Sequence, residues 1–385
     1  QLVAEGWLSA RRGAGTTVAA HAAAPDPAGG PPPAASDTRH DLRAGTPDLA
    51  SFPRSGWLAA ARRALAASPA SALGYGDPRG LPELRQALAG YLARARGVHA
   101  SADRIVVCSG FAHGLTLLCS ALRAGGARCV ATEAFGHASF RETIERAGFR
   151  ATTIDVDEQG AVVGDLGGED AVVLTPAHQF PLGVALAPSR RTGCVAWARD
   201  HGALVVEDDY DGEFRYDRQP VGALQALAPD HVVYCGTASK SLAPGLRLGW
   251  LVLPQRLVDE VAETRRLTGG PSAIDQLVLA ELIESGAYDR HVRRARHAYR
   301  RRRDRLAAAL RLPVGGVAAG MHVLVELDEP ERAVVARAER ASLRVEGLSE
   351  YAAPGTAHGP ALVVGYGTPP EHAYAAAVAA LAHVL

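Results

Sequence analysis

The chain has 385 residues with 41 basic and 41 acidic side chains, so its formal net charge is zero. A chain of this length has room for two or three domains, and its neutrality gives it no general attraction for polyanions, so any nucleic-acid contact must come from a local patch. No apolar run is long enough to span a membrane and no signal peptide opens the chain, which predicts a cytoplasmic protein without a membrane partner.

Cysteine spacing gives no sign of a metal site. The five cysteines are odd in number, lie in apolar runs, and form neither a CxxC motif nor a Cys/His pattern. We therefore expect buried, reduced thiols and no bound metal. These residues are Cys108, Cys119, Cys129, Cys194 and Cys235.

The first 40 residues predict a small hairpin and a linker. Segments 7–10 and 16–19 flank an Arg-Arg-Gly-Ala-Gly turn, so Arg11 and Arg12 would lie at the tip of the hairpin. Residues 21–40 are rich in Pro, Ala and Gly, which is typical of a semi-stiff linker. The only methionine is Met321, so we expect Gln1 not to be the natural start of the protein.

From residue 41 onward, short apolar strands alternate with helical segments. The runs are apolar almost throughout, as in strands buried on both faces, and predict a mostly parallel α/β sheet. We expect a large domain at 41–290 with an N-terminal arm and a small α+β domain at 291–385. The predicted strands of the large domain are 104–108, 128–132, 171–174, 203–206, 231–235 and 246–253, and those of the small domain are 322–327 and 361–366.

Lys240 is the only lysine, whereas the other 40 basic residues are arginines. A lysine amine can lose its proton when desolvated and attack a carbonyl, which a guanidinium cannot do. The pattern therefore indicates a lysine kept for covalent chemistry, with chance survival of one surface lysine as the alternative.

An acidic cluster follows the predicted strand 203–206, at the end of a strand where α/β sheets bind ligands. It consists of Glu207, Asp208, Asp209 and Asp211. Four carboxylates in five residues repel one another, which predicts a cationic partner. A solvated loop or a metal site is the alternative.

A third motif joins strand 104–108 to a helix. Gly110 stands at the turn, and Phe111 and Ala112 open the helix, so their free N–H groups could cradle an anion such as a phosphate.

The order of these motifs, with the stretch from Gly236 to Trp250, resembles the fold type I pyridoxal phosphate (PLP) enzymes of the aspartate aminotransferase superfamily over residues 41–385. The hairpin at 1–20 resembles the C-terminal remnant, or wing, of a winged helix-turn-helix DNA-binding domain, in which Arg11 and Arg12 would suit phosphate or minor-groove contact. An ordinary exposed hairpin is the alternative. With this hairpin and the linker in front, the whole chain resembles the MocR subfamily of GntR transcriptional regulators. Within that subfamily it is most similar to the PdxR type.

The resemblance implies that PLP is held on Lys240 as an internal aldimine. Arg247 would clamp the cofactor phosphate together with the hydroxyl of Thr237 and the cradle at Gly110. Asp208 would bond the pyridine nitrogen, and Tyr210 would donate to the phenolic oxygen.

Two further positions are implied by the same resemblance. His137 would stack on the cofactor ring, with a solvent-facing loop histidine as the alternative. Tyr75 would reach the phosphate of a neighbouring subunit, which implies a homodimer, with a packing tyrosine in a turn as the alternative.

Two departures from the family pattern bear on activity. Phe180 stands where the family's Asn-Pro-x-Gly motif has its asparagine, and Val363 stands where aminotransferases carry the arginine that binds the substrate carboxylate. We therefore expect a PLP-dependent transcriptional regulator that senses PLP, an amine or an amino acid, and that controls PLP biosynthesis. The alternative is a working class I/II aminotransferase whose wing-like N-terminus is only a structural arm.

Residues 288–305 contain nine arginines and two histidines. This density predicts a long helix whose arginine stems lie along the domain surface or the dimer seam. A DNA or interdomain docking face is the alternative.

Overall fold

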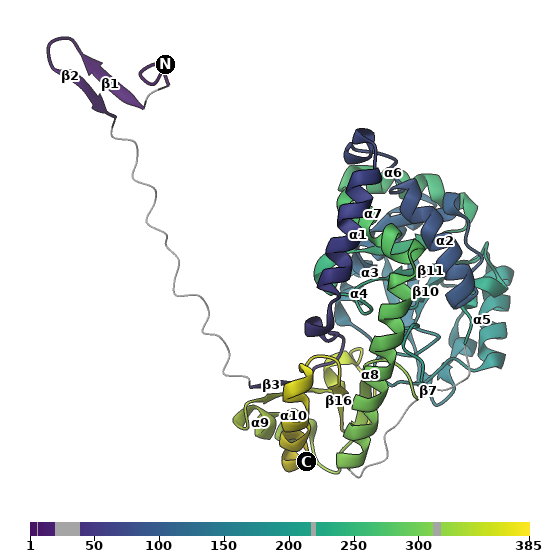
Figure 1. Ribbon diagram of the computed structural model, residues 1–385. Coiled ribbons are helices and arrows are strands. Elements are labelled where there is room, and N and C mark those ends of the chain that lie inside the picture. Colours follow the sequence, from purple (N-terminus) through teal and green to yellow (C-terminus); the bar gives the residue numbers. More distant parts are fainter. Residues whose placement is uncertain (6, 20–38, 217–220, 311–316) are drawn as a thin grey trace. The chain divides into compact units, whose positions relative to one another are not determined.

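The computed structural model describes residues 1–5, 7–19, 39–216, 221–310 and 317–385 (Figure 1). The chain forms two units, Gln1–Thr38 and Arg39–Leu385. No described helix is both long enough and apolar enough to cross a membrane. All five cysteines are buried and free of disulfides, as predicted.

The first unit contains an antiparallel hairpin of β1 (Leu8–Arg11) and β2 (Gly15–Val18). Gly13 and Gly15 have φ angles of 89° and 81°, which glycine adopts without the strain that a side chain would bring. Arg11 and Arg12 are exposed at the turn, so the predicted hairpin with a basic tip is confirmed. Of the predicted linker, 21–38 lies outside the described residues.

The second unit is built on a seven-stranded sheet with the order β4-β12-β11-β10-β9-β5-β6. β12 runs antiparallel to both neighbours and the remaining pairs are parallel, so the predicted mostly parallel sheet is confirmed. The strands are β4 (Ile105–Cys108), β5 (Cys129–Glu133), β6 (Arg150–Ile154), β9 (Ala171–Leu174), β10 (Leu204–Asp208), β11 (Val232–Thr237) and β12 (Gly249–Val252).

The edge strand β6 was absent from the sequence prediction. Its residues, Arg-Ala-Thr-Thr-Ile, are largely exposed or half-buried, and only Ile154 is buried. A strand with one neighbour does not need the continuous apolar run by which the central strands were recognised.

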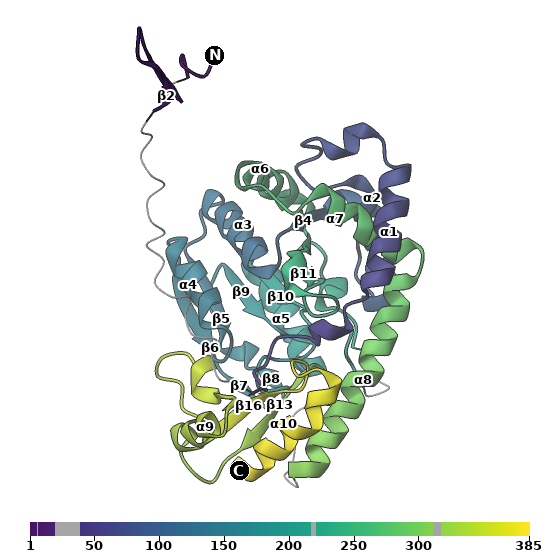
Figure 2. The same cartoon turned by 60° about the vertical axis from the view of Figure 1, so that its left-hand side comes forward.

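Helices cover both faces of this sheet (Figure 2). On β12, Trp250 and Val252 pack with one set of helices and Leu251 packs with the other, because successive side chains of a strand point to opposite faces. The first face carries α1 (Arg54–Ala67), α2 (Pro82–Arg96) and α7 (Ala273–Glu284), with α5 (Pro188–His201) farther along. The second face carries α3 (Phe111–Ala124), α4 (Ala138–Arg146) and α6 (Val258–Thr268).

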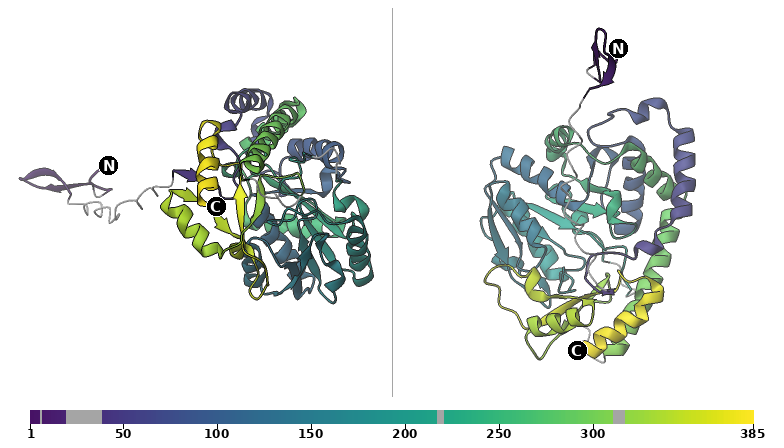
Figure 3. Two further views of the ribbon diagram at one scale, coloured as in Figure 1. Left: turned by 90° about the horizontal axis from the view of Figure 1, so that it is seen from below. Right: turned by 90° about the vertical axis from the view of Figure 1, so that its left-hand side faces the viewer.

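A smaller C-terminal part packs a three-stranded sheet against two helices (Figure 3). Its strands are β13 (His322–Glu326), β16 (Ala361–Gly365) and β15 (Glu346–Gly347), and its helices are α9 (Glu331–Arg340) and α10 (Glu371–Val384). The other short strand pairs are β3 (His40–Asp41) with β14 (Leu343–Arg344), and β7 (Val156–Asp157) with β8 (Gly160–Ala161).

The long helix α8 (Ala287–Leu310) joins the two parts of this unit and confirms the helix predicted for the arginine-rich stretch. It runs without interruption through residue 290, where the sequence analysis divides the large domain from the small one. The division at 290 and 291 stays a prediction.

Candidate functional site

A cavity of about 230 Å³ lies at the carboxyl ends of β4, β10 and β11. This is the edge at which open α/β sheets bind ligands. Nine of the ten residues predicted to bind the cofactor line it. They are Lys240, Asp208, Tyr210, Arg247, Thr237, Gly110, Phe111, Ala112 and His137.

Lys240 lies on the loop after β11, and its Nζ donates a hydrogen bond to the carbonyl oxygen of Gly45 at 2.5 Å. Burial lowers the pKa of the amine, and the nearby carboxylates of Asp208 and Asp211 act in the opposite direction. The net lowering increases the share of neutral amine, the form that can attack an aldehyde.

The carboxylates of the acidic cluster have separate surroundings. Asp209 lies 2.6 Å from the guanidinium of Arg96, and the side chains of Asp209 and Arg96 are 1% and 6% exposed. Asp209 also accepts a hydrogen bond from the hydroxyl of Tyr234. Asp211 lies 2.8 Å from Nδ1 of His178. The predicted cationic partner therefore exists for Asp209, and it is an arginine of this chain.

Glu207 and Asp208 complete the cluster. Glu207 accepts hydrogen bonds from the backbone N–H groups of Leu224 and Gln225 at 2.7 and 2.9 Å. Asp208 is the cluster carboxylate that lines the cavity, and its pKa is raised well above the usual value, mainly by burial. A buried carboxyl facing a cavity fits the protonated ring nitrogen of PLP, which would add a hydrogen-bonded cation at this position.

The cradle predicted at the start of α3 is present. Gly110 has a φ of 87° and caps the helix that begins at Phe111, so free N–H groups face the cavity. A Cβ on Gly110 would lie 3.6 Å from a guanidinium nitrogen of Arg247, and a Cβ on Gly249 would lie 2.8 Å from Cα of Gly110. The backbone and the arginine thus enclose a space that suits a phosphate.

Arg247 adopts a left-handed backbone conformation with a φ of 51°. A residue with a side chain in this region costs about 1–3 kcal/mol and usually occurs where function requires it. Thr237 Oγ1 lies 2.9 Å from Oγ of Ser239, which also lines the cavity. Sequence reasoning missed Ser239, although its hydroxyl stands two residues from Thr237.

The rings of His137 and Tyr210 lie at the cavity wall. His137 stacks on Phe180 with ring centroids 4.5 Å apart and an interplanar angle of 18°. The hydroxyl of Tyr210 lies 3.1 Å from Nδ1 of His178. Both rings can therefore meet a ligand in the cavity, although stacking on the cofactor and bonding to its phenolic oxygen stay predictions.

Tyr75 does not line the cavity of its own chain. It is fully exposed on the loop before α2, next to other residues of the Gly/Pro-rich turn. This position leaves the tyrosine free to reach a second copy of the chain, which stays a prediction.

Glu133 and Gly45 also line the cavity and were missed. Glu133 Oε2 accepts hydrogen bonds from Thr175 Oγ1 at 2.5 Å and Gln179 Nε2 at 3.3 Å, and burial raises its pKa to about 7. The position of Glu133 at the carboxyl end of β5 was the available signal.

The position of the missing arginine is closed to solvent. Val363 lies in β16, is 0% exposed, and packs in a cluster with Phe135, Phe180 and Tyr351. It therefore offers methyl groups where aminotransferases offer a cation.

The sheet order, the small C-terminal part, and a cavity that combines a lysine, an aspartate and a phosphate cradle define a fold type I PLP-binding protein. Residues 41–354 match the family "Aminotransferase class I and II". The chain is 34% identical over 381 residues to the HTH-type pyridoxine biosynthesis transcriptional regulator PdxR of Corynebacterium glutamicum, covering 96% of this chain and 83% of that protein. The chain belongs to the class I and II aminotransferase family and, within it, to the MocR-type transcriptional regulators.

Further similarities agree with this assignment. The chain is 31% identical over 334 residues to the probable rhizopine catabolism regulatory protein MocR of Rhizobium meliloti, covering 80% of this chain and 68% of that protein. An archaeal alanine:glyoxylate aminotransferase has a TM-score of 0.80 at 24% identity, with 90% of each chain covered. Aspartate aminotransferase from Thermus thermophilus has a TM-score of 0.77 at 25% identity, with 90% of this chain and 91% of that one covered.

The buried ion pair behind the cavity predicts a large loss of stability. Asp209→Asn leaves the guanidinium of Arg96 buried without its counter-charge, which should lower the free energy of unfolding by about 3–5 kcal/mol. The control is Asp230→Asn, because Asp230 is 73% exposed and pairs with Arg104 at 3.2 Å, so its loss should cost within about 0.5 kcal/mol. Urea unfolding followed by circular dichroism measures both, and equal losses would contradict this account.

Proposed function

We propose that the PLP state of this chain controls its binding to DNA, with the cavity as the effector sensor and Lys240 as the residue that holds the cofactor. The observation that carries the proposal is that the only lysine of the chain lines a cavity opposite a buried aspartate and beside a phosphate cradle. A requirement for positive charge does not explain a lysine at position 240, because arginine provides the positive charge everywhere else in the chain.

The predicted site residues would each hold one part of the cofactor. PLP supplies an electrophilic aldehyde and an electron-withdrawing ring when bound. Lys240 would hold the aldehyde carbon, and Asp208 would keep the ring nitrogen protonated. Arg247 would bind the phosphate together with Thr237 and the cradle, while the His137 ring would cover one face of the cofactor. The hydroxyl of Tyr210 would donate a hydrogen bond to the phenolic oxygen of the cofactor.

The regulatory function is favoured over catalysis by the apolar cluster behind the cavity wall. Val363 provides no cation for a substrate carboxylate, and the relatives PdxR and MocR are named as regulators. The similarity to the regulator of pyridoxine biosynthesis supports PLP itself as the effector. The protein would act in the cytoplasm as a homodimer, with Arg11 and Arg12 contacting DNA phosphates.

The first test concerns Lys240. Purified protein incubated with PLP should show visible absorption, and borohydride should fix a phosphopyridoxyl group on Lys240, read by peptide mass spectrometry. Lys240→Ala should lose both signals. The affinity of the protein for promoter DNA should respond to PLP in the wild type and not in this variant. A reduced wild-type protein without the label at Lys240 would remove the basis of the proposal.

The second test concerns the dimer. If Tyr75 donates a hydrogen bond to the cofactor phosphate of the other subunit, Tyr75→Phe removes a bond to a charged group worth roughly 1.5–3 kcal/mol, or about ten- to hundredfold in PLP affinity. The dimer should persist in light scattering. Leu73→Ala, an exposed position on the same loop, should retain full affinity. A monomer with full PLP occupancy would contradict the shared site.

The third test concerns catalysis. A carboxylate arriving beside Val363 would be desolvated without a partner, and loss of a two-bond arginine clamp costs on the order of a hundredfold in productive binding. Common α-amino acids should therefore convert the bound cofactor no faster than an amine of similar basicity that lacks a carboxylate. Stopped-flow absorbance measures both rates. Rapid conversion to the pyridoxamine form by any of the amino acids would favour the aminotransferase alternative.

A further inference from the structure

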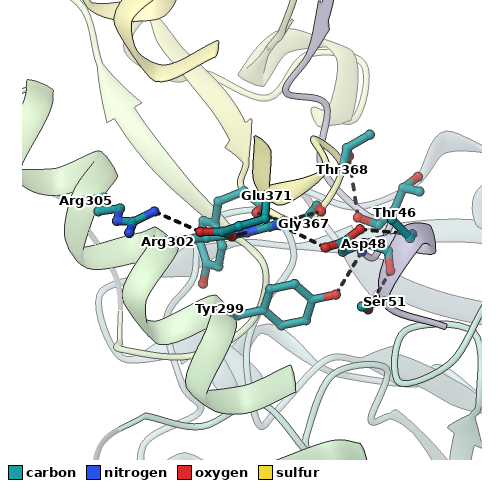
Figure 4. Close-up of polar contacts among 11 residues, drawn as sticks. Thr46, Asp48, Ser51, Tyr299, Arg302, Arg305, Gly367, Thr368 and Glu371 are labelled. Atoms are coloured by element: carbon teal, nitrogen blue, oxygen red, sulfur yellow. Dashed lines mark hydrogen bonds and ion pairs between the residues drawn. The ribbon is translucent and has the colours of Figure 1, made fainter. Parts of the chain in front are cut away.

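Arg302 differs from the other arginines of the arginine-rich helix because it is buried. Only 1% of this residue is exposed, whereas its neighbours Arg300 and Arg301 are exposed. Its guanidinium contacts Asp48 Oδ2 at 2.8 Å and Glu371 Oε2 at 3.1 Å (Figure 4). Burial of a guanidinium is costly unless its partners fit, and of its two carboxylate partners Asp48 is the more buried.

That segment, residues 42–48, is here called the arm. Tyr299, one turn before Arg302 on α8, accepts a hydrogen bond from the backbone N–H of Asp48 at 2.9 Å. Thr368 Oγ1 donates to the carbonyl of Arg43 at 3.2 Å. Arg302 also donates to the carbonyl of Gly367 at 2.8 Å, so one guanidinium joins the end of the arm to the segment that follows β16.

The backbone of the arm packs closely against the end of β16 and the residues that follow it. A Cβ on Gly365 would lie 2.2 Å from the carbonyl oxygen of Arg43, and one on Gly367 would lie 2.5 Å from that of Thr46. Backbone therefore meets backbone along the arm. With Asp48 fixed at one end by Arg302, Gly45 three residues earlier has little freedom.

Gly45 is the arm residue that enters the cavity. It has a φ of 86°, lines the cavity, and accepts the hydrogen bond from Lys240 Nζ at 2.5 Å. The chain of contacts thus runs from α8 through Asp48 and the arm to the amine that the proposed function assigns to the cofactor.

We propose that Arg302 is a positioning residue of the cofactor site. By anchoring Asp48, it holds the arm so that Gly45 covers the amine of Lys240 and excludes water from it. The part that concerns cofactor binding rests on the proposed function, whereas the contact between the arm and the amine does not.

The direction of the effect follows from the surroundings of the amine. Burial is the main cause that lowers the pKa of Lys240 below its usual value of 10.5, whereas the carboxylates of Asp208 and Asp211 raise it. The arm lies directly against the amine through the carbonyl of Gly45. A looser arm admits water, so the pKa of Lys240 should rise toward 10.5. The lost carbonyl contact acts in the opposite direction, but it is replaced by hydrogen bonds to the water that enters.

A single lysine makes this pKa directly measurable. Cofactor-free protein is labelled with a trace of acetic anhydride over a pH series, and the peptide that contains Lys240 is quantified by mass spectrometry apart from the terminal amine. Arg302→Gln and the milder Asp48→Asn should both move the labelling midpoint upward. Both should also release PLP faster than the wild type, by about tenfold.

Arg305→Gln is the matched control. Arg305 pairs with the same Glu371 at 2.9 Å but is exposed, and its ion pair does not involve the arm, so its loss should leave both readouts unchanged. Circular dichroism confirms folding, and Asp48→Asn decides the matter if Arg302→Gln does not fold. The proposal is overturned if a folded Arg302→Gln or Asp48→Asn variant keeps the wild-type labelling midpoint. It is also overturned if Arg305→Gln shifts that midpoint by the same amount. Wild type that binds no PLP would refute the proposed function and leave the midpoint test standing.

Discussion

The structure depends on how negative charge is compensated at the carboxyl edge of the sheet. β10 and the three residues after it place four carboxylates in a region that excludes water, and an unpaired buried charge there is strongly unfavourable. Backbone N–H groups satisfy Glu207, Arg96 satisfies Asp209, and His178 satisfies Asp211. Asp208 faces the cavity together with Lys240, and burial raises the pKa of its carboxyl, so the site suits the proposed contact with a cationic ring nitrogen.

Much of this fold could be predicted because its central strands are buried on both faces. Such strands read as continuous apolar runs, and β4, β9 and β11 were placed from them to within one or two residues. β6 carries no such signal because it lies at the edge with mostly exposed side chains. An apolar run in the sequence indicates burial, so it identifies a strand only where that strand is buried.

Most of the site was predictable because its residues stand in motifs at the carboxyl ends of strands, and the order of these motifs resembles a known family. Lys240 and Arg247 follow β11, while Asp208 ends β10 and Gly110 follows β4. Gly45 reaches the same cavity from 195 residues away, through an arm with no periodicity and no unusual residue type. Arg302 stands among nine arginines that look alike in sequence, and only the packing of Asp48 against α8 distinguishes it. Contacts of this kind are set by tertiary structure, so a single sequence does not contain a local signal for them.

The same fold serves catalysis and sensing, so the distinction must lie in individual positions of the site. An enzyme gains rate from groups that hold a substrate in the reactive geometry, and a carboxylate clamp is such a group. A sensor needs a ligand-dependent free-energy difference between two states of the protein. At β16 this chain gives up the clamp: Val363 completes an apolar cluster with Phe180, and that cluster supports the ring of His137 at the cavity wall. Under the proposed function, this position offers no partner to a substrate carboxylate, and the apolar cluster supports the ring that would cover the cofactor, so retention of the ligand is favoured over turnover.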